Sequence, residues 1–236
     1  MVKGINFDNF RDTGDPIFAS RVYNSQYVDE LVFLDIDATN EGRRTNAKII
    51  AEVSKECFMP LTIGGGVSSV EIIRELLNNG ADKVVINSAA YTDSDLIRKG
   101  ANRFGSQCIV LGIDVKKEDG AFILYKNSGR TRCDISLKDH IKNMVECGVG
   151  EIFVNNISND GVMQGYDLDL INKVTDLVNI PVIACGGAGN FQHLVDAYKG
   201  TNVSGLAMAS IYHFGDNNPI RARAHLMNNQ IPIKSV

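Results

Sequence analysis

Short runs of aliphatic and β-branched residues alternate with amphipathic helical patterns along the whole chain, and this order limits the possible folds more than any other feature. Strands that alternate with helices normally pair in parallel, so the pattern predicts an α/β protein built on a parallel sheet. The expected strands are residues 30–35, 59–63, 83–87, 108–113, 151–155, 181–184 and 205–208.

Capping residues mark the ends of the intervening helices. Residues 68–79 carry apolar positions on one helical face and are followed by Gly80, a typical residue just beyond a helix. Ser136 and Asn190 are the expected N-caps of two later helices. After the fourth strand, a β-hairpin is expected at residues 121–125, with a turn at 127–130.

One sequence pattern occurs twice. Thr62-Ile-Gly-Gly-Gly66, a helix and a strand are echoed by Ala184-Cys-Gly-Gly-Ala188, a helix and a strand. Such a half-and-half repeat favours a (βα)8 TIM barrel with a half-barrel internal repeat over an open doubly wound sheet. We expect a single barrel domain over residues 1–236. A closed barrel needs eight strands and seven are found, so the first strand is expected to be absent or irregular, with Val2-Lys3-Gly4 a loop leaving it.

Composition excludes several classes of protein. The chain has 24 Lys and Arg against 28 Asp and Glu, which does not provide the broad positive field of a nonspecific nucleic-acid binder. Its five cysteines are widely spaced without a Cys-x-x-Cys pair, and its four histidines lack metal-ligand spacing. We therefore expect no metal, no cofactor and a reducing cytoplasmic location. No signal peptide or membrane-spanning run is found.

Two glycine-rich turns are candidate phosphate sites. Gly64-Gly65-Gly66 and Gly186-Gly187-Ala188-Gly189 each end a strand and lead into a helix, where free N–H groups attract anions. The repeat places Gly66 with Asn87 and Ser88, and the second turn with Met208-Ala209-Ser210. Two such sites on one face indicate a substrate with a phosphate at each end. Alternatively, the glycines only permit tight turns.

Several carboxylates follow strands or begin helices. Asp35 closes a strand at the barrel face where active sites gather. Asp139 lies three residues after Ser136, a spacing that favours a helix capping box over a catalytic acid. Asp114 either lines the same mouth or orders a loop. Asp160-Gly161 either forms a turn or offers its backbone to a phosphate.

These motifs together resemble the HisF family, the cyclase subunit of imidazole glycerol phosphate synthase, over residues 2–214. The resemblance implies a barrel that receives ammonia from a glutaminase partner in a heterodimer. It implies that ammonia reacts with a ribulosyl bisphosphate substrate, which splits into imidazole glycerol phosphate and aminoimidazole carboxamide ribotide. The matching motifs include Val2-Lys-Gly-Ile-Asn-Phe7, Arg11-Asp-Thr-Gly-Asp-Pro16, Asp29-Glu-Leu-Val-Phe-Leu-Asp35, Ile63-Gly-Gly-Gly66, Gly80-Ala-Asp-Lys83, Phe104-Gly-Ser-Gln107, Asp160-Gly161 and Gly186-Gly-Ala-Gly189.

The resemblance also implies roles for individual residues. Asp139 is the implied general acid/base, reversing the preference from spacing alone, and Asp35 is a supporting carboxylate. A ring of charges at the opposite face would gate ammonia, and Asp82 would face the glutaminase. The implied phosphate ligands are Gly66, Asn87 and Ser88 for one phosphate, and Asp160, Gly161, Gly187, Ala209 and Ser210 for the other; the gate residues are Glu30, Lys83 and Glu151.

Three departures from the family keep other functions open. The family's first strand carries an aspartate in a Cys-Leu-Asp context, and nothing before Val2 supplies it. Asn155-Asn156 stand where histidine-pathway members usually carry hydroxyl residues, and Asp37-Ala38-Thr39 resembles a branch linked to acetamidino sugars of bacterial surface polysaccharide. The alternatives are an amidination partner in that synthesis, a noncatalytic scaffold that activates the glutaminase, and a sugar-phosphate isomerase.

Overall fold

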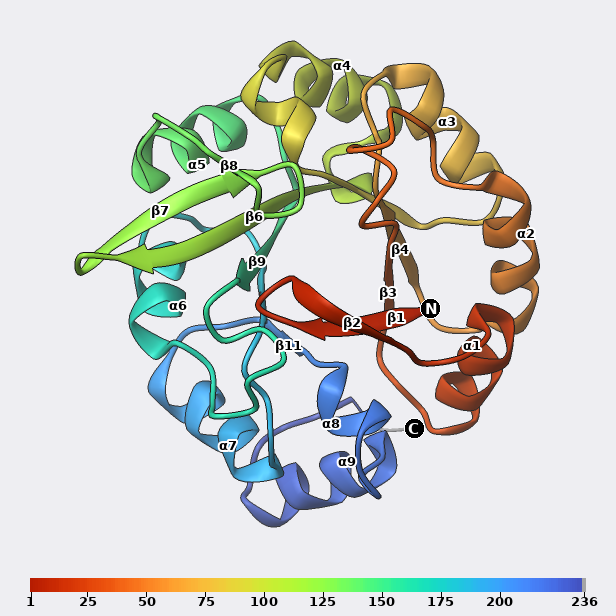
Figure 1. Ribbon diagram of the computed structural model, residues 1–236, viewed down its shortest axis with the longest axis vertical. Coiled ribbons are helices and arrows are strands. Elements are labelled where there is room, and N and C mark those ends of the chain that lie inside the picture. The colour runs from red at the N-terminus through yellow and green to blue at the C-terminus, as the bar shows by residue number, and fades with distance from the viewer. Residues whose placement is uncertain (235–236) are drawn as a thin grey trace.

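Seven parallel strands form one curved sheet in the computed structural model, which describes residues 1–234 (Figure 1). The strand order is β11-β10-β9-β6-β5-β4-β3, so consecutive βα units lie side by side. All seven predicted strands are confirmed. Their bounds are β3 Leu31–Leu34, β4 Leu61–Gly64, β5 Lys83–Ile86, β6 Ile109–Glu118, β9 Glu151–Asn156, β10 Val182–Cys185 and β11 Gly205–Ala207.

Helices surround the sheet on its outer side (Figure 1). The predicted N-caps are confirmed, since the side chains of Ser136 and Asn190 accept hydrogen bonds from the backbone of the first helical turn. The helices are α1 Pro16–Ser25, α2 Ala47–Glu56, α3 Val70–Asn78, α4 Ser94–Phe104, α5 Leu137–Glu146, α6 Leu168–Thr175, α7 Phe191–Gly200, α8 Ser210–His213 and α9 Pro219–Asn228, with 3₁₀ turns η1 Ser88–Tyr91 and η2 Ser106–Cys108.

The hairpin predicted after the fourth parallel strand is also confirmed. It consists of β7 Ala121–Lys126 and β8 Thr131–Arg132, and β6 continues to Glu118 because its outer half pairs antiparallel with β7. In the turn between β7 and β8, the backbone N–H of Asn127 donates to Ser88 Oγ at 3.0 Å. This bond fixes the hairpin turn beside the end of β5.

The amino-terminal segment differs from the predicted loop. Residues 2–12 form an antiparallel hairpin, β1 Val2–Ile5 and β2 Asp8–Asp12, which lies across the barrel in Figure 1. Its turn residues Asn6 and Phe7 have φ of 52° and 61°, values that match the twist of a tight hairpin turn. Asn6 N–H donates to the Asp160 carbonyl at 2.8 Å, which holds the hairpin on the loop after β9.

The sheet is curled as in a TIM barrel but is open between its two edge strands. Within residues 1–234, neither β3 nor β11 pairs with an eighth parallel strand. The last two residues of the predicted domain, 235 and 236, lie outside the described residues. No helix in the described part of the chain is long and apolar enough to cross a membrane.

The concave side of the sheet carries a small apolar layer. Val85, Val110 and Phe153 form its buried part, on three different strands. A larger apolar core fills the space between the sheet and the helices. Because side chains alternate between the two faces of a strand, each strand contributes to both cores.

A buried histidine links α5 to the loop after β5. His140 is 1% exposed and stacks on Tyr91, with ring centroids 4.1 Å apart and an interplanar angle of 6°. Its Nε2 has no hydrogen-bond partner among the described residues. Burial lowers the pKa of His140 to about 4 from the ordinary 6.5. The folded protein therefore holds this imidazole neutral.

This histidine is expected to weaken the fold in acid. Below pH 6.5 His140 is protonated in the unfolded chain, whereas in the folded chain it stays neutral until about pH 4. The free energy of unfolding therefore falls as the pH is lowered through this window. His140→Phe keeps the ring stack and removes the titration. We expect this variant to gain about 2 kcal/mol relative to wild type between pH 7.5 and pH 5, measured by urea unfolding. Parallel pH profiles would contradict the prediction.

Candidate active site

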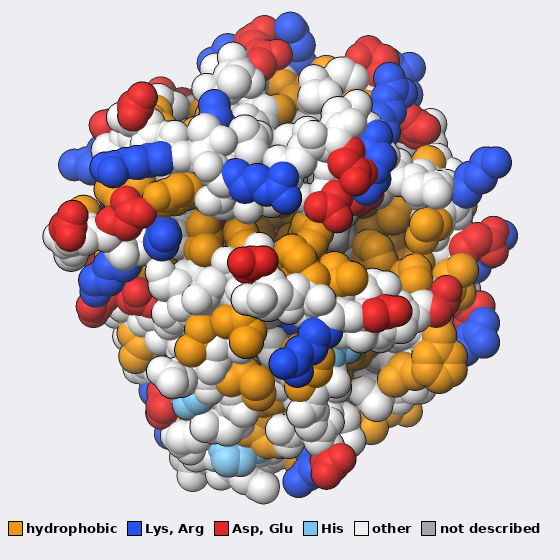
Figure 2. Space-filling model, viewed as in Figure 1, with side chains coloured by type: hydrophobic (Ala, Val, Ile, Leu, Met, Phe, Trp, Pro, Cys, Tyr) orange, Lys and Arg blue, Asp and Glu red, His pale blue; other side chains and the backbone are white. Residues whose placement is uncertain are grey.

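A cavity of about 1540 Å³ occupies the concave side of the sheet and the opening between β3 and β11. Figure 2 shows the hollow on this face, with hydrophobic side chains inside it and charged side chains around it. Polar residues at the carboxyl ends of the strands line the cavity, as do the apolar residues of the inner layer. The polar lining residues include Asp35, Asn87, Asp114, Asn155 and Asp160.

Asp114 is a half-buried carboxyl group of this lining, whereas Asp160 is 5% exposed. It lies on β6, and Asn87 Nδ2 donates to its Oδ2 at 2.9 Å. Burial raises the pKa of Asp114 to about 7, the charge of Asp160 adds to the effect, and the hydrogen bond from Asn87 opposes it. A carboxyl group with a pKa near 7 can both take up and release a proton at neutral pH. The sequence left two interpretations of Asp114, and the structure supports the one in which this residue lines the mouth of the barrel.

Asp139 lies elsewhere, in the first turn of α5. Its Oδ2 accepts from Ser136 Oγ at 2.7 Å, and its backbone N–H donates to the same hydroxyl at 3.1 Å. Ser136 thus caps the helix as the spacing predicted, but the Asp139 carboxylate bonds to the Ser136 hydroxyl and not to the backbone N–H expected in a capping box. Asp139 is exposed and is not among the cavity-lining residues, because α5 begins beyond the β7–β8 hairpin, in the outer ring of helices (Figure 1). The structure does not bring Asp139 to the site implied for a general acid/base.

Asp35 follows β3 and lines the cavity, as the sequence predicted. The Arg43 guanidinium donates to both of its carboxylate oxygens, at 2.6 and 3.0 Å, and the Ala38 backbone N–H donates at 3.2 Å. This geometry holds the Asp35 carboxylate in one orientation and balances its charge. Such a group suits a supporting role better than proton transfer.

The first predicted phosphate site is assembled at the rim of this cavity. Gly66, Asn87 and Ser88 all line it. Gly66 has φ of 63°, and a Cβ there would lie 2.5 Å from the Arg43 carbonyl, so only glycine fits. Lys126 also lines the cavity, is half-buried and forms no ion pair within residues 1–234. The sequence feature that could have identified Lys126 is its position immediately before the predicted hairpin turn at residues 127–130.

The second predicted phosphate site is partly covered. Asp160 and Ala209 line the cavity, whereas Gly161, Gly187 and Ser210 do not. The amino-terminal hairpin is the cause at Gly161, where a Cβ would lie 2.2 Å from the Gly4 carbonyl. Lys3 Nζ forms an ion pair with Asp160 at 2.5 Å, and both side chains are largely buried. Lys3 was not predicted as a site residue, because its partner is distant in sequence.

Three charged residues meet at the opposite, amino-terminal end of the strands. Lys83 Nζ lies 2.8 Å from Glu30 Oε2 and 2.8 Å from Glu151 Oε2. Burial disfavours the charged form of Lys83, but its hydrogen bonds to Glu151 and Glu30 prevail, and its pKa is raised. Burial raises the pKa of Glu151, against the effect of Lys83. The structure thus brings the three predicted gate residues together.

Asp82 lies next to this cluster, in the loop before β5. Its Oδ2 accepts from the Leu61 backbone N–H at 2.8 Å, and the residue is exposed. It therefore stands on the surface of the amino-terminal face, where the sequence predicted a partner contact. No group of three or more His, Cys, Asp or Glu within residues 1–234 is arranged to hold a metal ion.

The curled sheet, the polar mouth and the glycine turns define a class of βα-barrel proteins whose functional site lies at the carboxyl ends of the strands. A family model described as histidine biosynthesis protein matches residues 1–218, and the chain belongs to this family. Three relatives are each named imidazole glycerol phosphate synthase subunit HisF. They come from Streptococcus mutans (44% identity over 92% of this chain and 86% of the relative), Flavobacterium johnsoniae (42% over 99% and 93%) and Chlorobium limicola (41% over 99% and 93%).

Proposed function

We propose that this chain is the cyclase subunit of an imidazole glycerol phosphate synthase, a lyase of histidine biosynthesis. The observation that carries the proposal is Asp114, a half-buried carboxyl group with a pKa of about 7, within the same cavity as the glycine turn of Gly66. A proton-transfer group next to an anion site suits a reaction on a phosphorylated substrate. The family and the relatives' names agree with this assignment.

The substrate in this proposal is a ribulosyl bisphosphate that carries an aminoimidazole carboxamide. One phosphate would bind at Gly66, Asn87 and Ser88, with Lys126 supplying positive charge. The other would bind near Asp160 and Ala209, close to Lys3. Asp114 would move protons as ammonia adds to the substrate and the product fragments separate, and Asp35 would assist from the rim. The acid/base role thus goes to Asp114 instead of Asp139.

The interior of the sheet supports entry of ammonia from the opposite end. The charged cluster of Glu30, Lys83 and Glu151 stands at the start of the strands, and the apolar layer of Val85, Val110 and Phe153 lies between the two ends. Neutral ammonia crosses an apolar layer at far lower cost than ammonium does. The proposed partner is therefore a glutaminase docked on the amino-terminal face.

Two exposed aromatic residues suit this docking. Phe58 is 87% exposed and Tyr27 is 55% exposed, and both lie in loops that precede parallel strands, at the end of the barrel that holds Lys83. Exposed aromatic side chains often anchor protein interfaces.

Phe58→Ser is expected to lower glutamine-dependent turnover at limiting partner concentration by at least about tenfold, because an aromatic anchor is lost. Turnover with ammonium chloride should stay at the wild-type rate. The matched control is Ile220→Ser, which changes a 48% exposed residue in the first turn of α9, at the opposite rim. A wild-type glutamine-dependent rate in Phe58→Ser would show that Phe58 does not contribute to the interface.

The proposed function is tested with the purified chain, the ribulosyl bisphosphate substrate and ammonium chloride. We expect loss of the substrate absorbance and formation of aminoimidazole carboxamide ribotide, quantified by chromatography. The same assay with glutamine should need a glutaminase subunit. If neither nitrogen source gives product, with or without that subunit, the proposal is wrong.

A further inference from the structure

Two consecutive asparagines end β9, and their surroundings differ. Asn156 is satisfied: its Nδ2 donates to Asp167 Oδ2 at 3.1 Å, and its Oδ1 accepts from the Asn159 backbone at 3.2 Å. Asn155 is 8% exposed, and its Oδ1 is buried without a hydrogen-bond partner among the described residues. Neighbouring side chains of a strand point to opposite faces, so only Asn155 lies on the cavity side.

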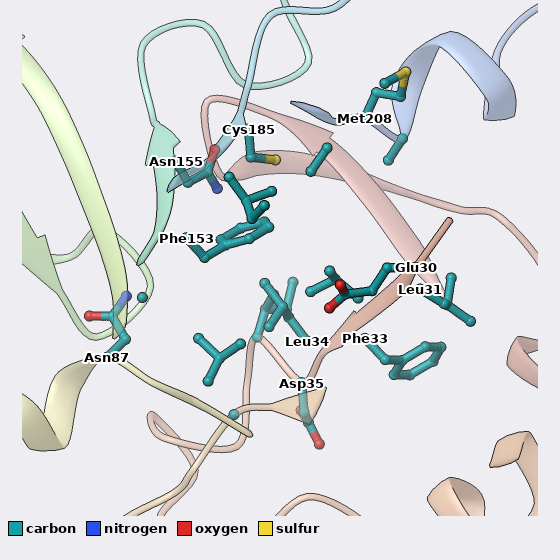
Figure 3. A pocket seen from close by; sticks show the side chains of 18 of the residues that line it. Glu30, Leu31, Phe33, Leu34, Asp35, Asn87, Phe153, Asn155, Cys185 and Met208 are labelled. Atoms are coloured by element: carbon teal, nitrogen blue, oxygen red, sulfur yellow. The ribbon is translucent and has the colours of Figure 1, made fainter. Parts of the chain in front are cut away.

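The position of Asn155 is central to the site. It pairs in register with Asp114 on one neighbouring strand and with Cys185 on the other. Figure 3 shows the side chains of Asn155, Cys185 and Phe153 together at one end of the pocket. A Cβ on Gly186 would lie 3.0 Å from Asn155 Oδ1, so a larger residue there would crowd the amide. The chain thus leaves room around a carboxamide that its own residues do not satisfy.

A buried amide oxygen without a partner destabilises the folded protein, because its hydrogen bonds to water are lost on folding and not replaced. A leucine of similar size would not have this cost. A ligand that bonds to both ends of the amide would restore the lost hydrogen bonds when it binds. Asn155 therefore has the properties of a ligand-recognition residue.

The surrounding charges select the kind of ligand group. Asp114 is the register neighbour of Asn155, so the part of the cavity next to the Asn155 carboxamide disfavours another anion. Lys3 is already paired with Asp160. A neutral planar group with one N–H donor and one carbonyl acceptor matches an asparagine carboxamide at both ends.

We infer that Asn155 is a specificity residue that binds the primary carboxamide of the substrate's imidazole through paired amide hydrogen bonds. The inference rests on the proposed function and adds the contact that distinguishes a carboxamide substrate from one without it. The phosphate contacts at the rim are the same for both kinds of ligand.

The test compares two ligands that differ by this group, aminoimidazole carboxamide ribotide and aminoimidazole ribotide, by calorimetry. Wild type should bind the carboxamide ribotide about tenfold more tightly, and Asn155→Leu should reduce this ratio to near one. The melting temperature of Asn155→Leu should equal or exceed that of wild type. Asn156→Leu is the matched control: it breaks two internal bonds, so it should lower the melting temperature and keep the tenfold ratio.

The outcomes separate the two levels of the proposal. If wild type binds neither ribotide, the proposed function is wrong. If wild type prefers the carboxamide ribotide and Asn155→Leu keeps the full preference, the function stands and the role of Asn155 is wrong. A wild type that binds both ribotides equally also overturns the role of Asn155.

Discussion

Asp114→Asn is expected to reduce turnover with ammonium chloride by about 10²- to 10⁴-fold, the usual loss when a general acid/base is removed. The variant keeps a side chain of the same size beside Asn87, so substrate binding should change far less than kcat. Steady-state kinetics with separate kcat and KM values measure this. The pH profile of the wild type should show a group near pH 7, and the variant should lack it.

The same substitution is expected to stabilise the protein. The folded-state pKa of Asp114 is about 7, above the ordinary 3.8. Asp114 therefore lowers the free energy of unfolding by an increasing amount as the pH rises between these values. Asn carries no such titration. Asp114→Asn should therefore gain stability relative to wild type, on the order of 3 kcal/mol at pH 8 and less at pH 5, measured by urea unfolding.

Asp139→Asn is the control for the activity change. It weakens the contact with Ser136 and should cost about 1 kcal/mol of helix capping without a large change in kcat. If Asp139→Asn abolished turnover and Asp114→Asn did not, the acid/base assignment would return to the residue that the family resemblance first implied.

Lys83→Met is expected to cause the largest loss of stability, about 3–5 kcal/mol at pH 8, because it leaves two partly buried carboxylates without their cation. Burial raises the pKa of Glu151, so protonation of Glu151 relieves part of this repulsion and the loss should be smaller at pH 5. Denaturant unfolding at both pH values measures the effect.

Two further variants sharpen this prediction. Lys117→Met removes an exposed cation paired with Asp169 and should cost less than about 1 kcal/mol. Adding Glu151→Gln to Lys83→Met should recover part of the lost stability, because one buried negative charge is removed. A double variant as unstable as the sum of the two single changes would contradict the charge cluster as the cause.

Sequence reasoning was most successful where a feature depends on neighbouring residues. Each parallel strand was recognised because it is a short apolar run between a helix and a turn, and the caps at Ser136 and Asn190 act within one helical turn. The glycine turns were found for the same reason, since Gly65 and Gly66 both need positive φ at the end of one strand.

The choice between Asp114 and Asp139 depended on contacts far apart in sequence. Local spacing predicted a cap for Asp139, but for Asp114, within β6, it left open whether the side chain lines the mouth or orders a loop. The Ser136 cap and the β7–β8 hairpin keep Asp139 outside, whereas the burial that raises the pKa of Asp114 comes from several strands. The pairing of Lys3 with Asp160, which covers one predicted phosphate site, joins residues that only folding brings together.

The sequence alone therefore determined the βα order, the glycine turns and the helix caps, because the hydrophobic period and the backbone preferences that produce them act over a few residues. Only the tertiary structure decided which carboxyl group has its pKa raised to about 7, how the amino-terminal hairpin lies over the barrel and that the Asn155 amide oxygen is left without a partner. Burial and electrostatic environment are set by the whole fold, and no local pattern contains them.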